Sequence, residues 1–345
     1  MPVLVLNNAR FGEHTPPPGH PERPERQDVM EAVAARWRQR GGAVAEAAAP
    51  APRDAILRVH GARFVETLEG SAGRAVMLDP DTFTSPESWE ITQLAAGAAV
   101  GAVDAVLDGP FTRAAALVRP PGHHSNRDLA RGFCLVNNAA VAAAHALARG
   151  LARVAVVDLD VHHGNGTQEI FEADPRVLYV STHQWPFYPG TGRADDMGVG
   201  PGRGFTVNVP MERGATDGDY AQVFDDVVVP VTRLFNPDLV IISAGFDAHE
   251  EDPIGSMRMS ADGFARLVGR LSAAAEDCAA GRVVLVTEGG YHLRALASSL
   301  SACLAAMDGG AAADPASGEG GGATGRGSAA VQQARAVQSA CWRGL

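Results

Sequence analysis

The sequence contains no lysine. All 29 of its basic residues are arginine, and 40 acidic residues leave a formal net charge of -11. This acidic balance does not favour a surface that binds duplex DNA or RNA, so we expect no direct nucleic-acid partner. It favours neutral or cationic ligands instead.

Cysteine is scarce as well. The four cysteines, Cys134, Cys278, Cys303 and Cys341, are far apart in the sequence and form no CxxC pair. This spacing argues against a structural zinc knot and against a disulfide framework, and it fits a reducing compartment.

The amino terminus has no long hydrophobic run. Its apolar stretch, Val3 to Leu6, lacks a basic start and is too short for a signal peptide or a membrane span, so we expect a cytoplasmic protein without a membrane partner. With 46% hydrophobic residues over 345 positions, the chain can bury a large core, and we expect a single domain over residues 1–345. Residues 308–330 are rich in Gly, Ala and Ser and predict a flexible loop before a last helix at about 331–338.

Short apolar runs alternate with long alanine-rich segments of helical pattern, which is typical of repeated strand and helix units. Because the strands are continuously apolar, we expect a parallel sheet covered by helices on both faces, an α/β three-layer architecture. One helix is predicted from Pro86 to Gly109 and another from Asn137 to Gly150. Strands are expected at 3–6, 114–118, 154–157, 177–180, 239–242 and 283–286.

Polar residues follow several of these strands, at the edge where ligands of such sheets gather. The densest stretch is Asp158-Leu159-Asp160-Val161-His162, directly after the strand that ends at Val157. Alternation along an extended chain sends Asp158, Asp160 and His162 to one side. This pattern indicates a divalent metal site, and the alternative is a strand-end Asp that caps a helix beside exposed histidines.

A second polar motif, Arg119-Pro120-Pro121-Gly122-His123-His124, follows the strand at 114–118. Tandem histidines on a Pro-Gly turn are rigidly held and are candidates for catalysis, although adjacent histidines are also common at surfaces. The next segment contains Phe133 on a glycine turn, where it could either wall a narrow pocket or belong to the core.

Six motifs together resemble the zinc-dependent deacetylase family, which includes histone deacetylases, acetylpolyamine amidohydrolases and acetoin-utilisation proteins. The resemblance covers most of the chain and implies the arginase-deacetylase fold, with a parallel sheet of about eight strands flanked by helices. The motifs, in the family's order, are PPGHH at 120–124, GFCLVNN at 132–138, DLDVHHGNG at 158–166, FYPGTG at 187–192, SAGFDAHEEDP at 243–253 and EGGY at 288–291.

The resemblance implies that Asp160, His162 and Asp247 bind a catalytic zinc ion, with a water molecule at the open position. Two oxygen ligands and one nitrogen ligand would also accept Fe²⁺ or Co²⁺. His163 is expected to lie outside this ligand set.

The resemblance also assigns catalytic roles to both histidines of the tandem pair. We expect His123 to act as the base and His124 as the acid that protonates the leaving amine. Asp158 would orient His123, and Asn165 would contact His124. Many relatives that resemble the nuclear enzymes carry Asp where this chain has Asn165, so the sequence is placed nearer the class II-like branch.

Further positions match the substrate-binding residues of the family. Tyr291 matches the tyrosine that stabilises the oxyanion. Phe133, which follows Gly132, and Tyr188 match the aromatic residues that sandwich the acyl-lysine stem. Arg26 matches an arginine near the acetate release channel. The alternative is that Arg26 is simply an exposed residue on a surface helix.

The family also binds structural potassium ions, mostly through backbone carbonyl groups. Asp158, Asp160, His162, Ser181 and Thr182 match one such site, and Phe171, Asp174, Val177 and Phe205 match a second.

The substrate is the least determined property. An acyl-lysine peptide or protein is the first expectation, an acetylated polyamine or other small amine the second, and non-hydrolytic binding of acyl-lysine the third. Ile254 stands where one polyamine-specific relative carries a glutamate, which weakens the polyamine hypothesis. Asp79, Asp81 and the run 249–252 could form an acidic rim or a solvated charge cluster. The oligomeric state is left open, with a homodimer as one option.

Overall fold

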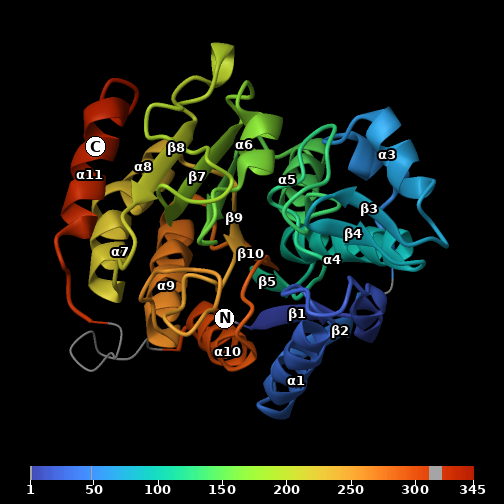
Figure 1. Cartoon of the computed structure of the whole chain (residues 1–345). Helices are drawn as coiled ribbons and strands as arrows, with labels where there is room; N and C mark the ends of the chain where they lie inside the picture. Colours follow the sequence, from blue (N-terminus) through green and yellow to red (C-terminus); the bar gives the residue numbers. More distant parts are fainter. Residues whose placement is uncertain (1, 48, 311–320) are drawn as a thin grey trace.

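A parallel sheet forms the middle layer of the computed structural model, which describes residues 2–47, 49–310 and 321–345 (Figure 1). Among these residues, eight strands pair in the order β2-β1-β5-β10-β9-β6-β7-β8, and every pairing is parallel. This confirms the predicted fold class. The strands are β1 (Val3–Asn7), β2 (Ala43–Glu46), β5 (Arg113–Ala116), β6 (Val154–Asp158), β7 (Val177–Gln184), β8 (Thr206–Met211), β9 (Leu239–Ala244) and β10 (Val283–Thr287).

Helices cover both faces of the sheet. One layer contains α1 (Glu25–Gln39), α7 (Asp217–Val223), α8 (Val229–Phe235), α9 (Ala261–Cys278), α10 (Leu293–Met307) and α11 (Arg326–Gln338). The other contains α2 (Arg53–Leu57), α3 (Ala62–Glu69), α4 (Ser88–Asp108), α5 (Asn138–Ala148) and α6 (Asn165–Phe171). Short helical turns lie at Ala9–Glu13, Gly200–Gly202 and Phe224–Val228.

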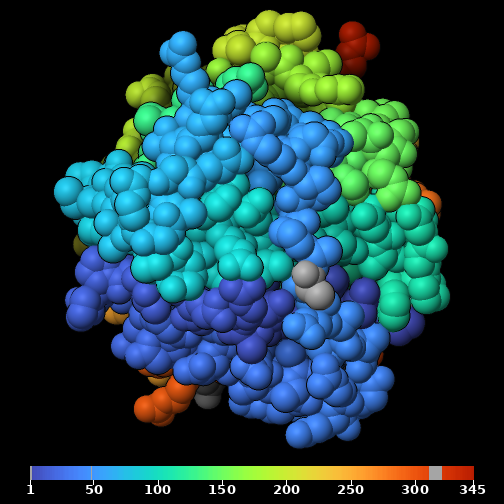
Figure 2. Space-filling model, turned by 90° about the vertical axis from the view of Figure 1, so that its right-hand side faces the viewer, coloured from blue at the N-terminus to red at the C-terminus, as the bar shows by residue number. Residues whose placement is uncertain are grey.

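An antiparallel hairpin of β3 (Val76–Asp79) and β4 (Thr82–Thr84) lies outside the main sheet. Figure 2 shows the face that contains this part of the chain, where the first hundred or so residues, coloured blue to cyan, form most of the surface.

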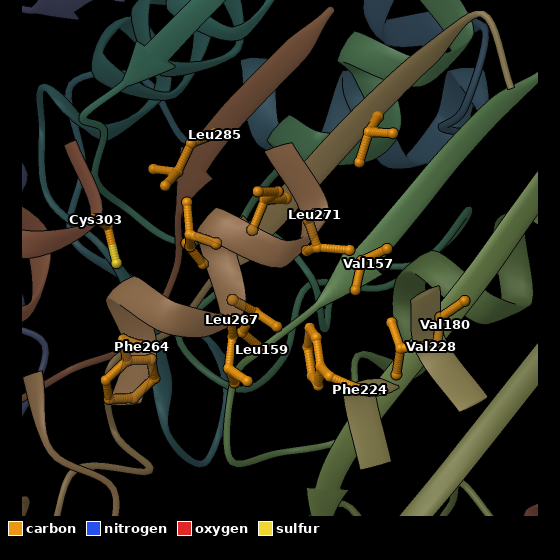
Figure 3. Close-up of a cluster of buried hydrophobic side chains, with 14 of the residues drawn as sticks. Val157, Leu159, Val180, Phe224, Val228, Phe264, Leu267, Leu271, Leu285 and Cys303 are labelled. Atoms are coloured by element: carbon orange, nitrogen blue, oxygen red, sulfur yellow. The ribbon is translucent and has the colours of Figure 1, made fainter. Parts of the chain in front are cut away.

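The strands alternate between two cores because successive side chains point to opposite faces of a sheet. Val157 and Ile242 pack into one core with the α7–α11 layer, whereas Val156 and Ile241 pack into the other with α4 and α5. Figure 3 shows Val157 in the first core, together with Leu267 and Leu271 of α9 and with Phe224 and Val228 of the helical turn before α8. Both faces of the sheet are therefore buried, as its continuously apolar strands predict.

Helix α4 is the described helix whose length and composition would allow it to cross a membrane. Of its most apolar stretch, 61% is buried inside the fold. It packs on α5 and β5, so it has the surroundings of a core helix.

Two strands of the sheet, β2 and β8, were not among the strands expected from the sequence. Helix α11 begins at Arg326, within the segment predicted as a loop. Residues 311–320 of that predicted loop lie outside the described residues. All four cysteines lie in the described part of the chain and are free thiols.

The start of α9 offers a test of local stability. Ser260 caps the helix: its hydroxyl accepts the backbone N–H of Gly263 at 3.1 Å and donates to Asp217 at 2.6 Å. We expect Ser260→Ala to lower the free energy of unfolding by about 1 kcal/mol, the usual value of an N-cap. The measurement is urea unfolding followed by circular dichroism.

The control for this prediction is Ser298→Ala in α10. The hydroxyl of Ser298 is exposed and donates only to carbonyl groups of its own helix. Its replacement should leave stability nearly unchanged, and an equal loss in both variants would contradict the capping role.

Candidate active site

Polar side chains gather at the carboxyl edge of the three neighbouring strands β10, β9 and β6. Asp158 ends β6, and Asp160 and His162 follow it. Asp247 lies three residues beyond β9, and Glu288 directly follows β10. Because parallel strands end at the same edge, residues far apart in the sequence meet there, as the sequence predicts.

Asp160, His162 and Asp247 form a compact buried group. One ligand atom from each lies within 4.8 Å of the other two. Nδ1 of His162 is 2.9 Å from Oδ1 of Asp160 and 3.1 Å from Oδ2 of Asp247, and Oδ2 of Asp247 accepts no hydrogen bond from the described residues. An ideal Cβ on Gly245 would lie 2.0 Å from Oδ2 of Asp160, and one on Gly289 would lie 2.4 Å from Oδ2 of Asp247. Glycine at both positions leaves room for the carboxylates, and this donor set fits a divalent cation.

The charges of this group also favour a cation. Burial, and then the neighbouring Asp160 carboxylate, raise the pKa of Asp247 to about 7. Burial lowers the pKa of His162, but the two carboxylates outweigh it and raise that pKa to about 9. Two buried carboxylates side by side are costly without a positive charge between them, and a bound metal ion supplies that charge.

His123 lies beside a carboxylate. Its Nδ1 is 3.1 Å from Oδ2 of Asp158, which also accepts the hydroxyl of Tyr179 at 3.1 Å. Burial lowers the pKa of His123, but Asp160 and Asp158 outweigh it and raise the pKa to about 10. The surroundings of His123 therefore favour the imidazolium form.

His124 lies beside a neutral amide. Its Nδ1 is 2.8 Å from Oδ1 of Asn165, and its ring centre is 4.0 Å from that of His123. Burial, followed by repulsion from His123 and His162, lowers the pKa of His124 well below its usual value. The two adjacent histidines thus have opposite protonation preferences, because His123 lies beside the carboxylates of Asp160 and Asp158 whereas His124 is buried beside two other imidazoles.

Tyr291 follows a glycine turn and is contacted through both its backbone and its ring. Its backbone N–H donates to Oδ2 of Asp252 at 2.7 Å, and the guanidinium of Arg26 lies 5.2 Å from its ring centre. Arg26 is completely buried and donates to the carbonyl of Gly290 at 2.8 Å, so it is not a surface helix residue. Burial raises the pKa of Tyr291 well above its usual value, and the hydroxyl therefore keeps its proton near neutral pH.

The aromatic residues expected in the substrate tunnel lie around these groups. Phe133 packs edge-on against Tyr291, with ring centres 5.7 Å apart, and Tyr188 packs edge-on against His124 at 5.0 Å. Gly132 has a φ of 58°, and a Cβ there would lie 2.4 Å from the His124 ring. Glycine at 132 therefore allows the chain to pass close to the ring of His124.

The acidic residues considered for a rim are placed differently from one another. Asp81 accepts the N–H of Gly132 at 3.2 Å, and its own N–H lies 3.4 Å from Asp79, so both belong to the segment that supports the tunnel turn. In the run 249–252, Asp252 is buried beneath Tyr291, and only the two glutamates between His249 and Asp252 are exposed. Ile254 is half-buried on the same loop.

The residues expected at the first potassium site lie together between β6 and β7. Asp158 is in register with Ser181. The hydroxyl of Thr182 lies 3.4 Å from the carbonyl oxygen of Asp158. Asp160 and His162 follow directly after β6.

The residues expected at the second potassium site lie where α6 leads into β7. The N–H of Asp174 donates to the carbonyl of Phe171 at 2.8 Å, and the N–H of Val177 donates to the carbonyl of Asp174 at 3.2 Å. The carbonyl of Phe205 accepts the N–H of Tyr179, two residues into the same strand, at 2.8 Å. Binding of potassium at either position stays a prediction.

Glu288 is a site residue to which the sequence assigned no role. Its carboxylate accepts the N–H groups of Gly122 and His123 at 2.6 and 3.1 Å and the hydroxyl of Ser243 at 2.9 Å. Burial raises its pKa to about 7. A glutamate directly after a continuously apolar strand is the signal that could have indicated this buried role, because a buried carboxylate needs several donors.

Two other aromatic side chains complete the site. Phe187 stacks on His162, with ring centres 5.2 Å apart and planes 13° apart. No role was predicted for Phe187, although it precedes Tyr188 in the motif at 187–192. Both ring nitrogens of His163 are engaged, by Thr191 at 2.8 Å and by Gln168 at 2.9 Å, and His163 is not in the Asp160 group.

Comparison with known proteins agrees with this geometry. A family model described as the histone deacetylase domain matches residues 20–307. A probable deacetylase of Archaeoglobus fulgidus is 40% identical over 90% of this chain and 87% of its own length. The histone deacetylase-like amidohydrolase of Pseudomonas aeruginosa is 41% identical over 79% of this chain and 73% of its own length. The crystal structure of the HDA15 HD domain superimposes with a TM-score of 0.90 at 36% identity, covering 99% of this chain and 95% of that one.

The human polyamine deacetylase HDAC10 is 41% identical over 94% of this chain but only 50% of its own length. The chain thus spans about half the length of that relative. The fold and the relatives define a deacetylase that acts by hydrolysis. The chain belongs to the histone deacetylase family, as its sequence motifs indicate.

Proposed function

We propose that this chain removes acetyl or other short acyl groups from lysine side chains of peptides or proteins by metal-assisted hydrolysis. The observation that supports this most directly is the buried Asp160-His162-Asp247 group, which lies at the same strand edge as two histidines of opposite protonation preference. We propose zinc as the bound ion, with Fe²⁺ or Co²⁺ as alternatives, and structural potassium at the two groups described above. The free thiols fit a cytoplasmic location.

Asp160, His162 and Asp247 would hold the metal ion, which when bound polarises the amide carbonyl and acidifies a water molecule. The glycines at 245 and 289 keep the two carboxylates close to each other. Phe187, stacked on His162, limits the movement of that imidazole.

The two histidines would transfer protons in the order opposite to the one expected from the sequence. A neutral imidazole can accept a proton, and burial together with repulsion from His123 and His162 favours the neutral form of His124. An imidazolium can donate one, and the carboxylate partner of His123 favours the charged form. We therefore propose His124 as the base that takes a proton from the attacking water and His123 as the acid that protonates the leaving amine.

Tyr291 would donate a hydrogen bond to the carbonyl oxygen of the substrate as negative charge develops on it. Its raised pKa keeps that proton in place. Phe133 and Tyr188 would pack against the alkyl stem of the acylated side chain, in a passage that excludes water from the amide.

A peptide or protein substrate is favoured over a polyamine by the rim. Ile254 is apolar, so this position offers no carboxylate to a second ammonium group. The carboxylate of Asp81 is bound to the N–H of Gly132, which ties it to the tunnel wall. Hydrolysis of acetylpolyamines is the second candidate, supported by the name of the human relative.

The test is parallel hydrolysis of acetyl-lysine peptides, acetylputrescine, acetylspermidine and longer acyl-lysines by zinc-loaded protein. We expect kcat/KM for an acetyl-lysine peptide to exceed that for acetylspermidine. Faster hydrolysis of the polyamines by orders of magnitude would overturn the proposed substrate, and binding of acyl-lysine without turnover would overturn the proposed reaction.

A matched variant tests the rim argument in the same assay. Ile254→Glu adds one carboxylate to the rim loop and should raise the ratio of polyamine to peptide kcat/KM. The control is Val199→Glu, which adds a carboxylate at an exposed residue on another loop. This variant should leave the ratio unchanged.

A further inference from the structure

We propose that Glu169, on α6, is a positioning residue that fixes the side-chain amide of Asn165 and thereby the tautomer of His124. The inference rests on the proposed function, because it assigns His124 Nε2 as the proton-accepting atom. It concerns a residue that does not touch the catalytic groups directly.

The contacts form a closed circuit around His124. Oε1 of Glu169 accepts Nδ2 of Asn165 at 3.1 Å and a guanidinium N–H of Arg131 at 2.5 Å. Arg131 also donates through Nε to the backbone carbonyl of His124 at 3.2 Å. The side chain of Asn126 donates to Oε2 of Glu169. Asn165 and Glu169 are four residues apart on α6 and so lie on one face of the helix.

The direction of each hydrogen bond follows from what each group can do. An ionised carboxylate only accepts, so the Asn165 group that faces Glu169 must be the NH₂ group. The amide oxygen then faces Nδ1 of His124, 2.8 Å away, and Nδ1 must carry a hydrogen. A neutral imidazole has a single N–H, which leaves the lone pair on Nε2.

A rotated Asn165 amide would have the opposite effect. Its oxygen would face the carboxylate of Glu169, acceptor against acceptor, and its NH₂ group would face Nδ1 of His124. Nδ1 would then accept a hydrogen bond, and the proton would move to Nε2, which could no longer act as a base. Glu169 opposes this rotation because its carboxylate accepts a hydrogen bond from the NH₂ group in one orientation and is repelled by the amide oxygen in the other.

The dependence on Glu169 is specific to an amide at position 165. A carboxylate has two equivalent oxygens and accepts from Nδ1 in either orientation, as Asp158 does from His123. With Asp at position 165, Glu169 would no longer position anything. It would instead place a second negative charge within hydrogen-bonding distance of the first.

The experiment therefore compares Glu169→Ala in two backgrounds, wild type and Asn165→Asp, with an acetyl-lysine peptide and zinc-loaded enzyme. In the wild-type background we expect kcat to fall by about 10- to 100-fold, as for other residues that orient a catalytic group, with KM nearly unchanged. In the Asn165→Asp background we expect Glu169→Ala to leave kcat unchanged or to raise it. Glu172→Ala, one turn further along and outside the circuit, is the control in both.

A purely structural role for Glu169, through Arg131 and Asn126, predicts the same loss in both backgrounds. That result would overturn the proposal, as would an unchanged kcat in the wild-type background.

A second measurement does not depend on activity. In protein labelled with ¹⁵N-histidine, NMR should show His124 of the wild type as the Nδ1–H tautomer and should show a mixture of tautomers, or the Nε2–H form, in Glu169→Ala. A wild-type Nε2–H tautomer would overturn the proposal. If the wild type hydrolyses none of the amides, the proposed function fails, while the NMR comparison still decides the role of Glu169.

Discussion

Asp247→Asn should remove the catalytic metal and almost all activity. The substitution keeps the size of the side chain and an oxygen for the N–H of Val161, which Asp247 accepts at 2.8 Å, so the fold should be retained. It removes one of the two negative charges that face His162, and an amide is a much weaker ligand than a carboxylate for a divalent ion. We expect kcat/KM to fall by more than the roughly 10- to 100-fold that follows loss of a residue that only hydrogen-bonds to a metal ligand. Metal content by inductively coupled plasma mass spectrometry and the peptide assay check both parts.

The control for Asp247→Asn is Asp195→Asn. Asp195 is exposed and, among the described residues, forms an ion pair only with Arg193 on the surface, where such a pair contributes little to stability. This variant should keep one divalent ion per chain and wild-type activity. Full metal occupancy in Asp247→Asn would remove Asp247 from the ligand set.

In the metal-free protein, Asp247→Asn should affect the free energy of unfolding in a pH-dependent way. Here the substitution is favourable, because it removes a buried carboxylate that has no metal ion beside it. The pKa of Asp247 is raised to about 7 by burial and by Asp160, above the ordinary value of 3.8 in an unfolded chain. A group with a raised acid pKa destabilises the fold as pH rises, because the unfolded chain releases its proton first. The stability of metal-free wild type relative to Asp247→Asn should therefore decrease between about pH 4 and 7 and then level off, as measured by urea unfolding in the presence of a chelator.

The contrast between β6 and β8 shows what the sequence could indicate about the fold. All five residues of β6, Val154–Asp158, are buried and four of them are apolar, so the apolar run itself marks the strand. In β8 the valines Val207 and Val209 alternate with the polar residues Thr206 and Asn208, which are also buried. The burial of Asn208 is tolerated because its amide donates a hydrogen bond to the side chain of Gln168. Such partners come from other parts of the chain, and no local pattern reveals them.

Arg26 and Glu288 show the same limit at the site. An arginine in a charged helical segment resembles a surface residue until Glu22 and the carbonyl groups of the 288–291 turn are placed around it. The ligand trio was easier to predict because carboxylates and a histidine after buried strands have few other roles. The partners Asp158 and Asn165 were expected and lie beside the two histidines. The protonation of each ring also depends on its burial and on other nearby charges, such as Asp160 and His162, which no local pattern reveals.

Tyr291→Phe should retain the metal and the fold but lose most of the activity. The substitution removes a single hydroxyl and keeps the ring that packs on Phe133 and beneath Arg26, and the backbone remains bound to Asp252. The hydroxyl matters only when charge develops on the substrate oxygen, so its loss should lower kcat rather than raise KM. Other oxyanion donors contribute roughly 2.7–4 kcal/mol, which corresponds to a fall in kcat of about 10²- to 10³-fold.

The matched control for Tyr291→Phe is Tyr220→Phe, which also removes one buried tyrosine hydroxyl. In the described part of the chain that hydroxyl has no hydrogen-bond partner, and Tyr220 lies on α7 with its side chain in the core. Equal metal content, equal melting temperature and wild-type kcat are expected for this variant. A Tyr291→Phe enzyme with wild-type kcat would remove Tyr291 from the mechanism, whereas loss of metal would show that the tyrosine supports the ligand group instead of the developing oxyanion.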